Sequence, residues 1–218
     1  MTTENKITIL YFYDPLCGWC YGFSEVIKQF WLKHKDNWHF EVFSGGMVTG
    51  ERIGPLANIA PYLRNAYKTV EERTGVLFGK AYLDELFGEA SMLMSSIEPG
   101  IVLSIFKSFE TGNDIAFASA IQKAIYYNGV APTKMEAFAP YAAQHGVAEE
   151  DFLSRLKKPA YHDAVLKDFE LSKRYGVQGF PTLLMKSNTE NHLLAHGYVD
   201  LETLESRVNE IVASMQST

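Results

Sequence analysis

The chain has 218 residues and a formal net charge of −6. With 47% hydrophobic and 21% charged residues, its composition is that of a globular protein with a sizeable core, which argues against intrinsic disorder. The acidic balance leaves no basic stripe for a phosphate backbone, so we expect no nucleic-acid partner. No apolar run approaches the roughly 20 residues that span a bilayer, and the amino-terminal apolar run lacks a signal-peptide cleavage site. We therefore expect no membrane partner and a cytoplasmic location.

The first part of the chain predicts a strand, a helix and a second strand. Residues 7–13 are almost continuously apolar and rich in β-branched and aromatic side chains, which is typical of a strand covered on both faces. From Gly18 onward apolar residues recur at helical spacing, and residues 39–43 alternate between apolar and polar. These elements are the ingredients of a βαβ unit.

Residues 51–159 predict helices almost throughout, divided into helix-sized pieces by glycine and proline. The clearest piece covers residues 114–128, and Gly129 is a good terminator for it. Another helix is expected to begin at Thr133, because Glu136 lies at capping-box spacing from it. No linker rich in glycine or serine separates this block, so we expect an insertion packed on the sheet.

The last part of the chain predicts a helix over residues 163–175, then two strands over residues 182–186 and 192–196 around the polar turn SNTEN. Asp200 is expected to cap a final helix. The predicted fold class is therefore α/β, with a large helical insertion between a βαβ half and an αββα half. Residues 1–50 and 160–218 would form one discontinuous domain, and residues 51–159 would form the insertion domain.

Both cysteines of the chain lie in DPLCGWCY, where the first strand meets the first helix. In the cytoplasm structural disulfides are rare, so a close pair is more often catalytic or metal-binding. The unpaired N–H groups and the dipole at a helix N-terminus lower the pKa of a cysteine placed there. We expect Cys17 to be the exposed nucleophile, and Cys20 to resolve the mixed disulfide by attacking Cys17.

The CxxC motif at a strand–helix junction, the helical insertion and the later segment GVQGFPT together resemble the DsbA-like family of thioredoxin-fold thiol–disulfide oxidoreductases. The stretch DPLCGWCYGF is similar to the FrnE-like branch, described as predicted disulfide isomerases. The resemblance covers nearly the whole chain and implies a thioredoxin-like fold. It also implies an oxidoreductase or isomerase that acts on protein or small-molecule disulfides through Cys17 and Cys20. No bound cofactor is implied, because glutathione or another thiol reductant would recycle the pair as a co-substrate.

The resemblance also assigns supporting residues. Pro181 would be the family's cis proline, which faces the cysteines, and together with Phe180 and Thr182 it would hold an extended substrate chain by strand addition. Gly18 and Trp19 stand between the cysteines, where DsbA has Pro-His and thioredoxin has Gly-Pro. Because Trp19 brings no positive charge to the thiolate, we expect the pair to be less oxidising than one with histidine there. In a reducing cytosol the pair should then rest as a dithiol.

Two other functions stay open. Glutathione-dependent transferases or isomerases of the kappa class resemble DsbA in fold, but they activate glutathione with a hydroxyl at the position of Cys17, and the intact CxxC argues against them. The second alternative is a non-catalytic metal-binding module. His192 and His196 share one face of a predicted strand and form a nominal Cys₂His₂ set with the cysteines. Their separation is unlike that of a zinc finger, so we expect no metal and two partly exposed histidines.

Overall fold

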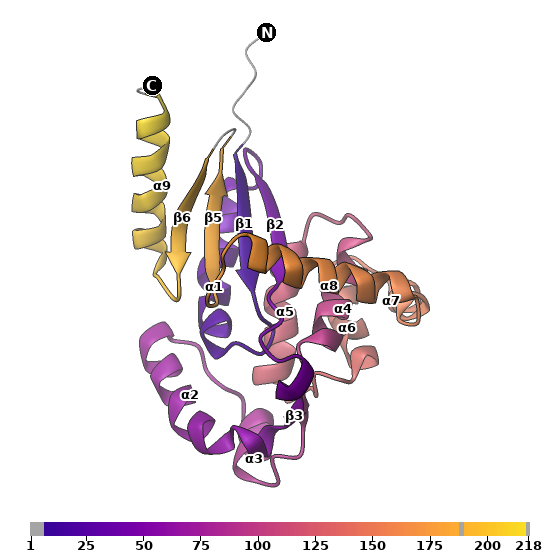
Figure 1. Ribbon diagram of the computed structural model, residues 1–218. Helices are drawn as coiled ribbons and strands as arrows, with labels where there is room; N and C mark the ends of the chain where they lie inside the picture. The colour runs from indigo at the N-terminus through magenta and orange to yellow at the C-terminus, as the bar shows by residue number, and fades with distance from the viewer. Residues whose placement is uncertain (1–6, 188–189, 217–218) are drawn as a thin grey trace.

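A four-stranded sheet forms the centre of the computed structural model, which describes residues 7–187 and 190–216 (Figure 1). The strands are β1 Thr8–Tyr13, β2 His39–Ser44, β5 Thr182–Lys186 and β6 Asn191–His196. Their order is β2-β1-β5-β6, with β2 parallel to β1, and with β5 antiparallel to both β1 and β6. These strands confirm the four that the sequence predicts. The predicted turn between the last two falls partly on residues 188 and 189, outside the described residues.

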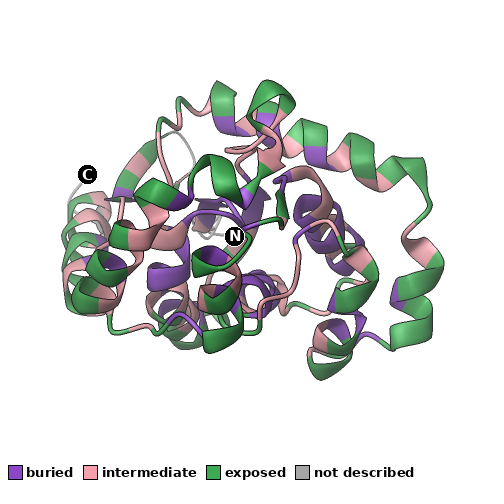
Figure 2. Ribbon diagram, turned by 90° about the horizontal axis from the view of Figure 1, so that it is seen from below, coloured by how far each residue is buried: buried purple, intermediate pink, exposed green. Residues whose placement is uncertain are grey.

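Helices pack on both faces of the sheet and extend beyond its lower end in Figure 1. They are α1 Gly18–His34, α2 Ala60–Thr74, α3 Lys80–Phe87, α4 Ile97–Lys107, α5 Asp114–Tyr126, α6 Ala139–Gln144, α7 Glu149–Arg155, α8 Pro159–Arg174 and α9 Leu201–Gln216. Seen from below, most helices turn exposed residues outward and buried residues toward the interior (Figure 2). The predicted cap of α9 is confirmed, because the Thr203 N–H donates to Asp200 Oδ1 at 2.8 Å. In the described part of the chain, no helix combines the length and the apolarity needed to cross a bilayer.

Strand β1 is buried on both faces, as its apolar sequence predicts. Ile9, Tyr11 and Tyr13 belong to a large core shared with α1, α5 and α9. Leu10 and Phe12 belong to a smaller core on the other face, where α8 packs. Burying one large apolar side chain stabilises a fold by about 1.5–3 kcal/mol. Because β1 buries such side chains on both faces, it holds the two layers together and fixes the position of Asp14, which follows it.

The helical block differs from the prediction in two details. It contains a short antiparallel pair of strands, β3 Gly54–Pro55 and β4 Leu93–Met94. The expected helix start at Thr133 is wrong, because a 3₁₀ turn occupies Met135–Phe138 and α6 begins only after it. Pro140 explains the difference: it fits the first turn of α6, whereas a helix begun at Thr133 would place this proline in its interior.

The insertion and the sheet share one continuous apolar core that includes residues of β1, α1, α4, α5 and α9. Polar contacts join them as well. The Lys107 ammonium at the end of α4 donates to the Val42 carbonyl of β2 at 2.8 Å and lies 3.9 Å from the Asp168 carboxylate of α8. The expectation that the insertion packs on the sheet is met, while the boundaries at residues 50 and 160 stay a prediction.

Candidate active site

Cys17 is the N-cap residue of α1. Its backbone is extended, and its sulfur accepts the N–H of Cys20 at 3.4 Å. The Cys17 N–H in turn donates to the Asp14 carbonyl at 3.0 Å, which closes a tight turn after β1. The sulfur therefore lies at the positive end of the helix dipole, beside N–H groups that have no partner within the helix.

Both sulfurs are less accessible than the sequence suggests. Cys17 is 7% exposed and Cys20 is fully buried, so the expectation of an exposed Cys17 is wrong. The reason is tertiary: the loop before β5 covers the sulfur, and the Cys17 thiol donates to the Phe180 carbonyl at 3.4 Å. Cys17 nevertheless keeps the only exposed surface of the pair.

Burial sets the protonation of Cys20. It raises the pKa of the Cys20 thiol well above its usual value, and the adjacent Cys17 sulfur adds to the effect. The phenol of Tyr11 lies in the same buried region, where burial and then the charge of Cys20 raise its pKa. Cys20 is therefore a thiol at neutral pH.

The loop from Gly179 to Thr182 forms the wall that faces the cysteines. The peptide bond between Phe180 and Pro181 is cis, as the resemblance implies. Thr182 anchors the loop, because its hydroxyl donates to the Gly179 carbonyl at 2.8 Å. Gly45, after β2, makes room for the Phe180 ring, since a Cβ at position 45 would overlap that ring. The sequence analysis did not recognise this requirement at Gly45.

Asp14, the residue that follows β1, is a buried hub. One carboxylate oxygen accepts the Leu16 N–H and the Ser96 hydroxyl, both at 2.9 Å, and the other accepts the Met47 N–H at 2.7 Å. Burial raises the pKa of Asp14, and the hydrogen bonds from these donors oppose the increase. The carboxyl group thus joins the cysteine turn, the loop after β2 and the start of α4. An aspartate directly after an apolar strand was the only signal available for it.

Gln122 of α5 reaches the cysteine turn from the opposite side. Its side-chain amide N–H groups donate to the carbonyls of Asp14 and Cys17, at 3.2 and 3.4 Å. The side chain is buried, and its amide oxygen has no hydrogen-bond partner among the described residues. The insertion therefore holds the two ends of the turn that presents Cys17.

We expect Gln122→Glu to destabilise the protein more than Gln122→Leu. Leucine removes the unpaired oxygen, and the Asp14 and Cys17 carbonyls keep their backbone donors, so its cost should stay near about 1 kcal/mol. Glutamate has a similar shape but places a carboxylate against two carbonyls near buried Asp14, which should cost about 3 kcal/mol or more. Urea unfolding at pH 7 measures both variants, and equal losses would contradict the assigned donor role.

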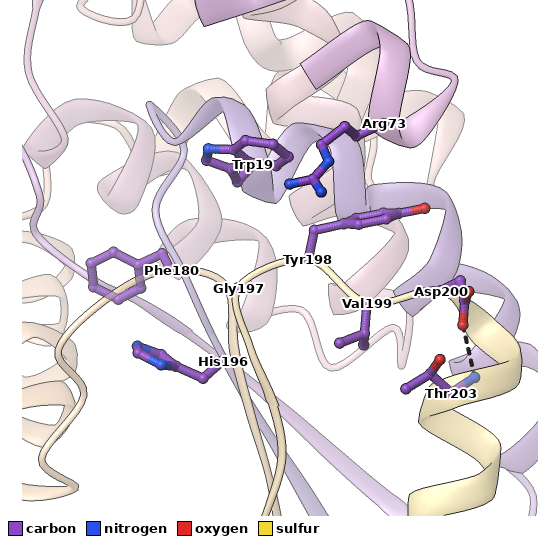
Figure 3. A pocket seen from close by; sticks show the side chains of 9 residues that line it. All are labelled: Trp19, Arg73, Phe180, His196, Gly197, Tyr198, Val199, Asp200 and Thr203. Carbon is purple, nitrogen blue, oxygen red and sulfur yellow. Dashed lines mark hydrogen bonds between the residues drawn. The ribbon is translucent and has the colours of Figure 1, made fainter. Parts of the chain in front are cut away.

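A cavity of about 550 Å³ opens beside the loop from Gly179 to Thr182 (Figure 3). Trp19 of α1 and Phe180 border it on the side of the cysteines, and Arg73 extends into it from α2. The remaining lining residues come from the end of β6 and the start of α9: His196, Gly197, Tyr198, Val199, Asp200 and Thr203. Within the described residues Arg73 forms no ion pair, so its guanidinium is available to an anionic group. The lining also holds one carboxylate, that of Asp200, which accepts the Thr203 N–H at the start of α9. We refer to this space as the cationic cavity, after Arg73.

The two histidines of the nominal metal set do not come together with the cysteines. A β-bulge in the pairing of β5 with β6 breaks the alternation, so that Leu194 and Ala195 are both buried and His192 and His196 leave the common face predicted for them. Among residues 7–187 and 190–216, no group of three or more histidine, cysteine, aspartate or glutamate residues could hold a metal ion. The metal-binding alternative therefore lacks a site in this part of the chain.

Comparison with known proteins finds a family profile that matches part of the chain, and a set of similar structures. Residues 110–209 match the profile of the DSBA-like thioredoxin domain. A predicted protein disulfide isomerase from Nitrosomonas europaea superposes with a TM-score of 0.83 at 22% identity, over 96% of this chain and 98% of that one. The cytosolic disulfide reductase DsbM from Pseudomonas aeruginosa, in its structure with glutathione, superposes with a TM-score of 0.75 at 24% identity, over 97% of this chain and 100% of that one. The oxidoreductase NmDsbA1 from N. meningitidis superposes with a TM-score of 0.57 at 11% identity, over 100% of this chain and 87% of that one. No curated protein matches the chain.

Proposed function

We propose that the chain is a DsbA-like thiol–disulfide oxidoreductase that works through Cys17 and Cys20. The match of residues 110–209 to the DSBA-like thioredoxin domain and the shared fold of the neighbours support this proposal. The observation that carries the proposal is the position of the Cys17 sulfur. It caps α1, accepts the Cys20 N–H and faces the Phe180 carbonyl. A sulfur at a helix N-terminus, a second thiol one turn away and a backbone edge for an extended substrate are the parts that disulfide exchange requires.

In the reducing direction, the reaction begins at Cys17. The Cys17 thiolate attacks one sulfur of a substrate disulfide, forms a mixed disulfide and releases the first substrate thiolate. Cys20 then loses its proton and attacks the Cys17 sulfur, which releases the second substrate thiolate and leaves a disulfide between Cys17 and Cys20. Two glutathione molecules reduce this disulfide and become one glutathione disulfide, so two electrons pass from glutathione to the substrate.

We place this activity in the cytoplasm and favour reduction or reshuffling over net oxidation. Trp19 offers no positive charge to stabilise the Cys17 thiolate further, and a reducing cytosol keeps such a pair as a dithiol. The cytosolic reductase DsbM, which has the same fold, is compatible with this direction. The substrates are disulfide-bearing proteins or low-molecular-weight thiols, and no bound cofactor is needed because the pair itself stores the electrons.

Glutathione is the recycling thiol that we propose for the cationic cavity. The cavity begins at Phe180, whose carbonyl touches the Cys17 sulfur, so a thiol bound there lies beside the pair. Arg73 can bind a carboxylate of glutathione through a charge-assisted hydrogen bond. The neighbour DsbM has a structure with glutathione, which is compatible with this assignment.

The test is insulin reduction with glutathione, combined with trapping. We expect Cys17→Ser to lower kcat/KM by at least about a thousandfold, because the attacking sulfur is gone. Cys20→Ser should instead accumulate a mixed disulfide on Cys17 that mass spectrometry detects, because the resolving step is lost. The proposal would be contradicted if no thiol donor supported turnover and Cys20→Ser accumulated no mixed disulfide on Cys17. Activity toward an electrophile that survives Cys20→Ala without any disulfide reduction would instead favour the kappa-class alternative.

A further inference from the structure

Trp19 separates two cavities of different chemistry. On one side lies the cationic cavity. On the other, a groove of about 330 Å³ runs along α2 between Trp19 and Tyr62 and continues into a narrow cleft of about 60 Å³ beneath Gly18. We refer to the groove and its cleft together as the α2 groove. The larger part falls within the range of about 300–1,000 Å³ that is typical of small-molecule sites.

The α2 groove is uncharged. Its lining residues are Gly18, Trp19, Tyr62, Leu63, Asn65, Ala66, Tyr67, Thr69, Val70, Phe78, Tyr82 and Tyr126. Its floor is built by aromatic packing, in which the Phe78 ring lies 5.7 Å from that of Tyr82 and 5.2 Å from that of Tyr126. A Cβ added at Gly18 would lie 3.8 Å from both Phe78 and Val70, so the backbone between the two cysteines rests on this floor. The groove therefore reaches Gly18, which follows Cys17 in the chain.

Tyr62 stands on the rim of the groove with 70% of its surface exposed. An aromatic ring exposed to this degree beside a second ring, that of Trp19, offers a stacking surface for an apolar group. The two cavities thus differ in what they can hold. Arg73 attracts an anion on one side, whereas the tryptophan and tyrosine rings attract an apolar group on the other.

We propose that the α2 groove binds the apolar half of mixed disulfides whose other half is an anionic small thiol held at Arg73; this inference rests on the proposed function. A disulfide under attack carries one substituent on each sulfur, and the two substituents point away from one another. Because Phe180 lies beside Cys17 and also borders the cationic cavity, the half that becomes bonded to Cys17 is the anionic one. The protein thereby selects adducts of a glutathione-like thiol with aromatic or aliphatic thiols.

The reaction balances as follows for a glutathione adduct. The Cys17 thiolate attacks the glutathione sulfur, a bond between Cys17 and that sulfur forms, and the disulfide bond of the substrate breaks. The apolar thiolate leaves along the α2 groove and takes a proton from solvent. Cys20 then attacks Cys17 and releases glutathione, and two further glutathione molecules reduce the enzyme disulfide.

The test compares two substrates with the full-length protein and glutathione as the reductant: the mixed disulfides of glutathione with benzyl thiol and with 2-hydroxyethanethiol. We expect kcat/KM for the benzyl adduct to exceed that for the hydroxyethyl adduct about tenfold, since small differences in apolar contact discriminate substrates to this degree. Tyr62→Ala and Ala66→Glu should remove this preference and leave turnover of the hydroxyethyl adduct within about twofold of wild type, because its short polar half gains little from the aromatic rings of the groove. Tyr127→Ala is the matched control, because Tyr127 is also an exposed tyrosine but lines neither cavity.

The outcomes separate the two proposals. If wild type reduces both mixed disulfides but shows no preference for the benzyl adduct, the α2 groove proposal is overturned and the oxidoreductase proposal stands. The same holds if Tyr62→Ala and Tyr127→Ala lower the benzyl preference equally. If wild type reduces neither mixed disulfide, both proposals fail together.

Discussion

Replacing Asp14 with alanine is expected to lower the free energy of unfolding by at least about 3 kcal/mol, because the change strands buried donors at about 1–3 kcal/mol each. The donors are the N–H groups of Leu16 and Met47 and the hydroxyl of Ser96. Asp14→Asn keeps one acceptor oxygen and should fall between wild type and alanine. Urea unfolding at pH 7 measures the series.

Asp84→Ala serves as the surface control, since Asp84 is 63% exposed and pairs only with Lys80 on the outer face of α3. It should change stability by less than about 0.5 kcal/mol. A loss of less than about 1 kcal/mol for Asp14→Ala would contradict the role of Asp14 as a hub. An Asp14→Ala protein that does not fold, beside a destabilised but folded Asp14→Asn, would support that role.

The same carboxyl group predicts the direction of a pH effect. Burial raises the folded pKa of Asp14 above its usual 3.8, so the folded state holds the proton more tightly than the unfolded state does. The stability that Asp14 contributes through this tighter proton binding is therefore complete below pH 3.8, and it is lost as the pH rises through the folded pKa of Asp14. Because asparagine does not titrate in this range, the stability of Asp14→Asn should fall less steeply than that of wild type as the pH rises. Some slope will remain, because burial raises the pKa values of Asp114 and Asp168 in the same direction.

The resolving step is expected to accelerate about tenfold per pH unit from pH 6 to pH 8.5, because it needs the Cys20 thiolate and the thiolate fraction grows tenfold per unit below the pKa. Burial raises the pKa of Cys20 well above its usual value, so the thiolate stays scarce over this whole range. The measurement is glutathione release from a protein carrying glutathione on Cys17, followed by rapid quenching at each pH.

Cys20→Ser is the control for this measurement, because it should release no glutathione at any pH in the absence of added thiol. A rate that levels off below pH 8 would mean that Cys20 ionises near or below its ordinary pKa. That outcome would contradict the effect of burial assigned here, while the order of attack by Cys17 and Cys20 would be unaffected.

Most of the fold could be predicted because its signals are local. The apolar run of β1, the helical spacing after Gly18 and the alternation of β2 each depend on residues a few positions apart. The wrong start for the helix before Gly146 came from two competing local signals: the spacing of Thr133 and Glu136 suggested a cap, but Pro140 decides where that helix begins. The cis bond before Pro181 was predicted from the motif GVQGFPT, since the base rate for such bonds is only about 5–6%.

The residues that support the site could not be predicted in the same way. Ser96 is 82 residues from Asp14 along the chain, and Gln122 is 108 residues from it. A hydrogen bond over such a separation produces no periodic pattern, and a serine or glutamine in a helical segment looks the same whether it faces solvent or a buried turn. Only the packing of α4 and α5 against the end of β1 identifies them.

The sequence by itself determined the order of strands and helices and the place of the two cysteines at the start of α1, because spacing and turn chemistry act over a few residues. The tertiary structure alone decided that Phe180 covers the Cys17 sulfur, that a β-bulge separates His192 from His196, and that α2 builds an uncharged groove beside Trp19. These features arise where segments far apart in the chain pack together. Their chemistry therefore depends on contacts that no short stretch of sequence encodes.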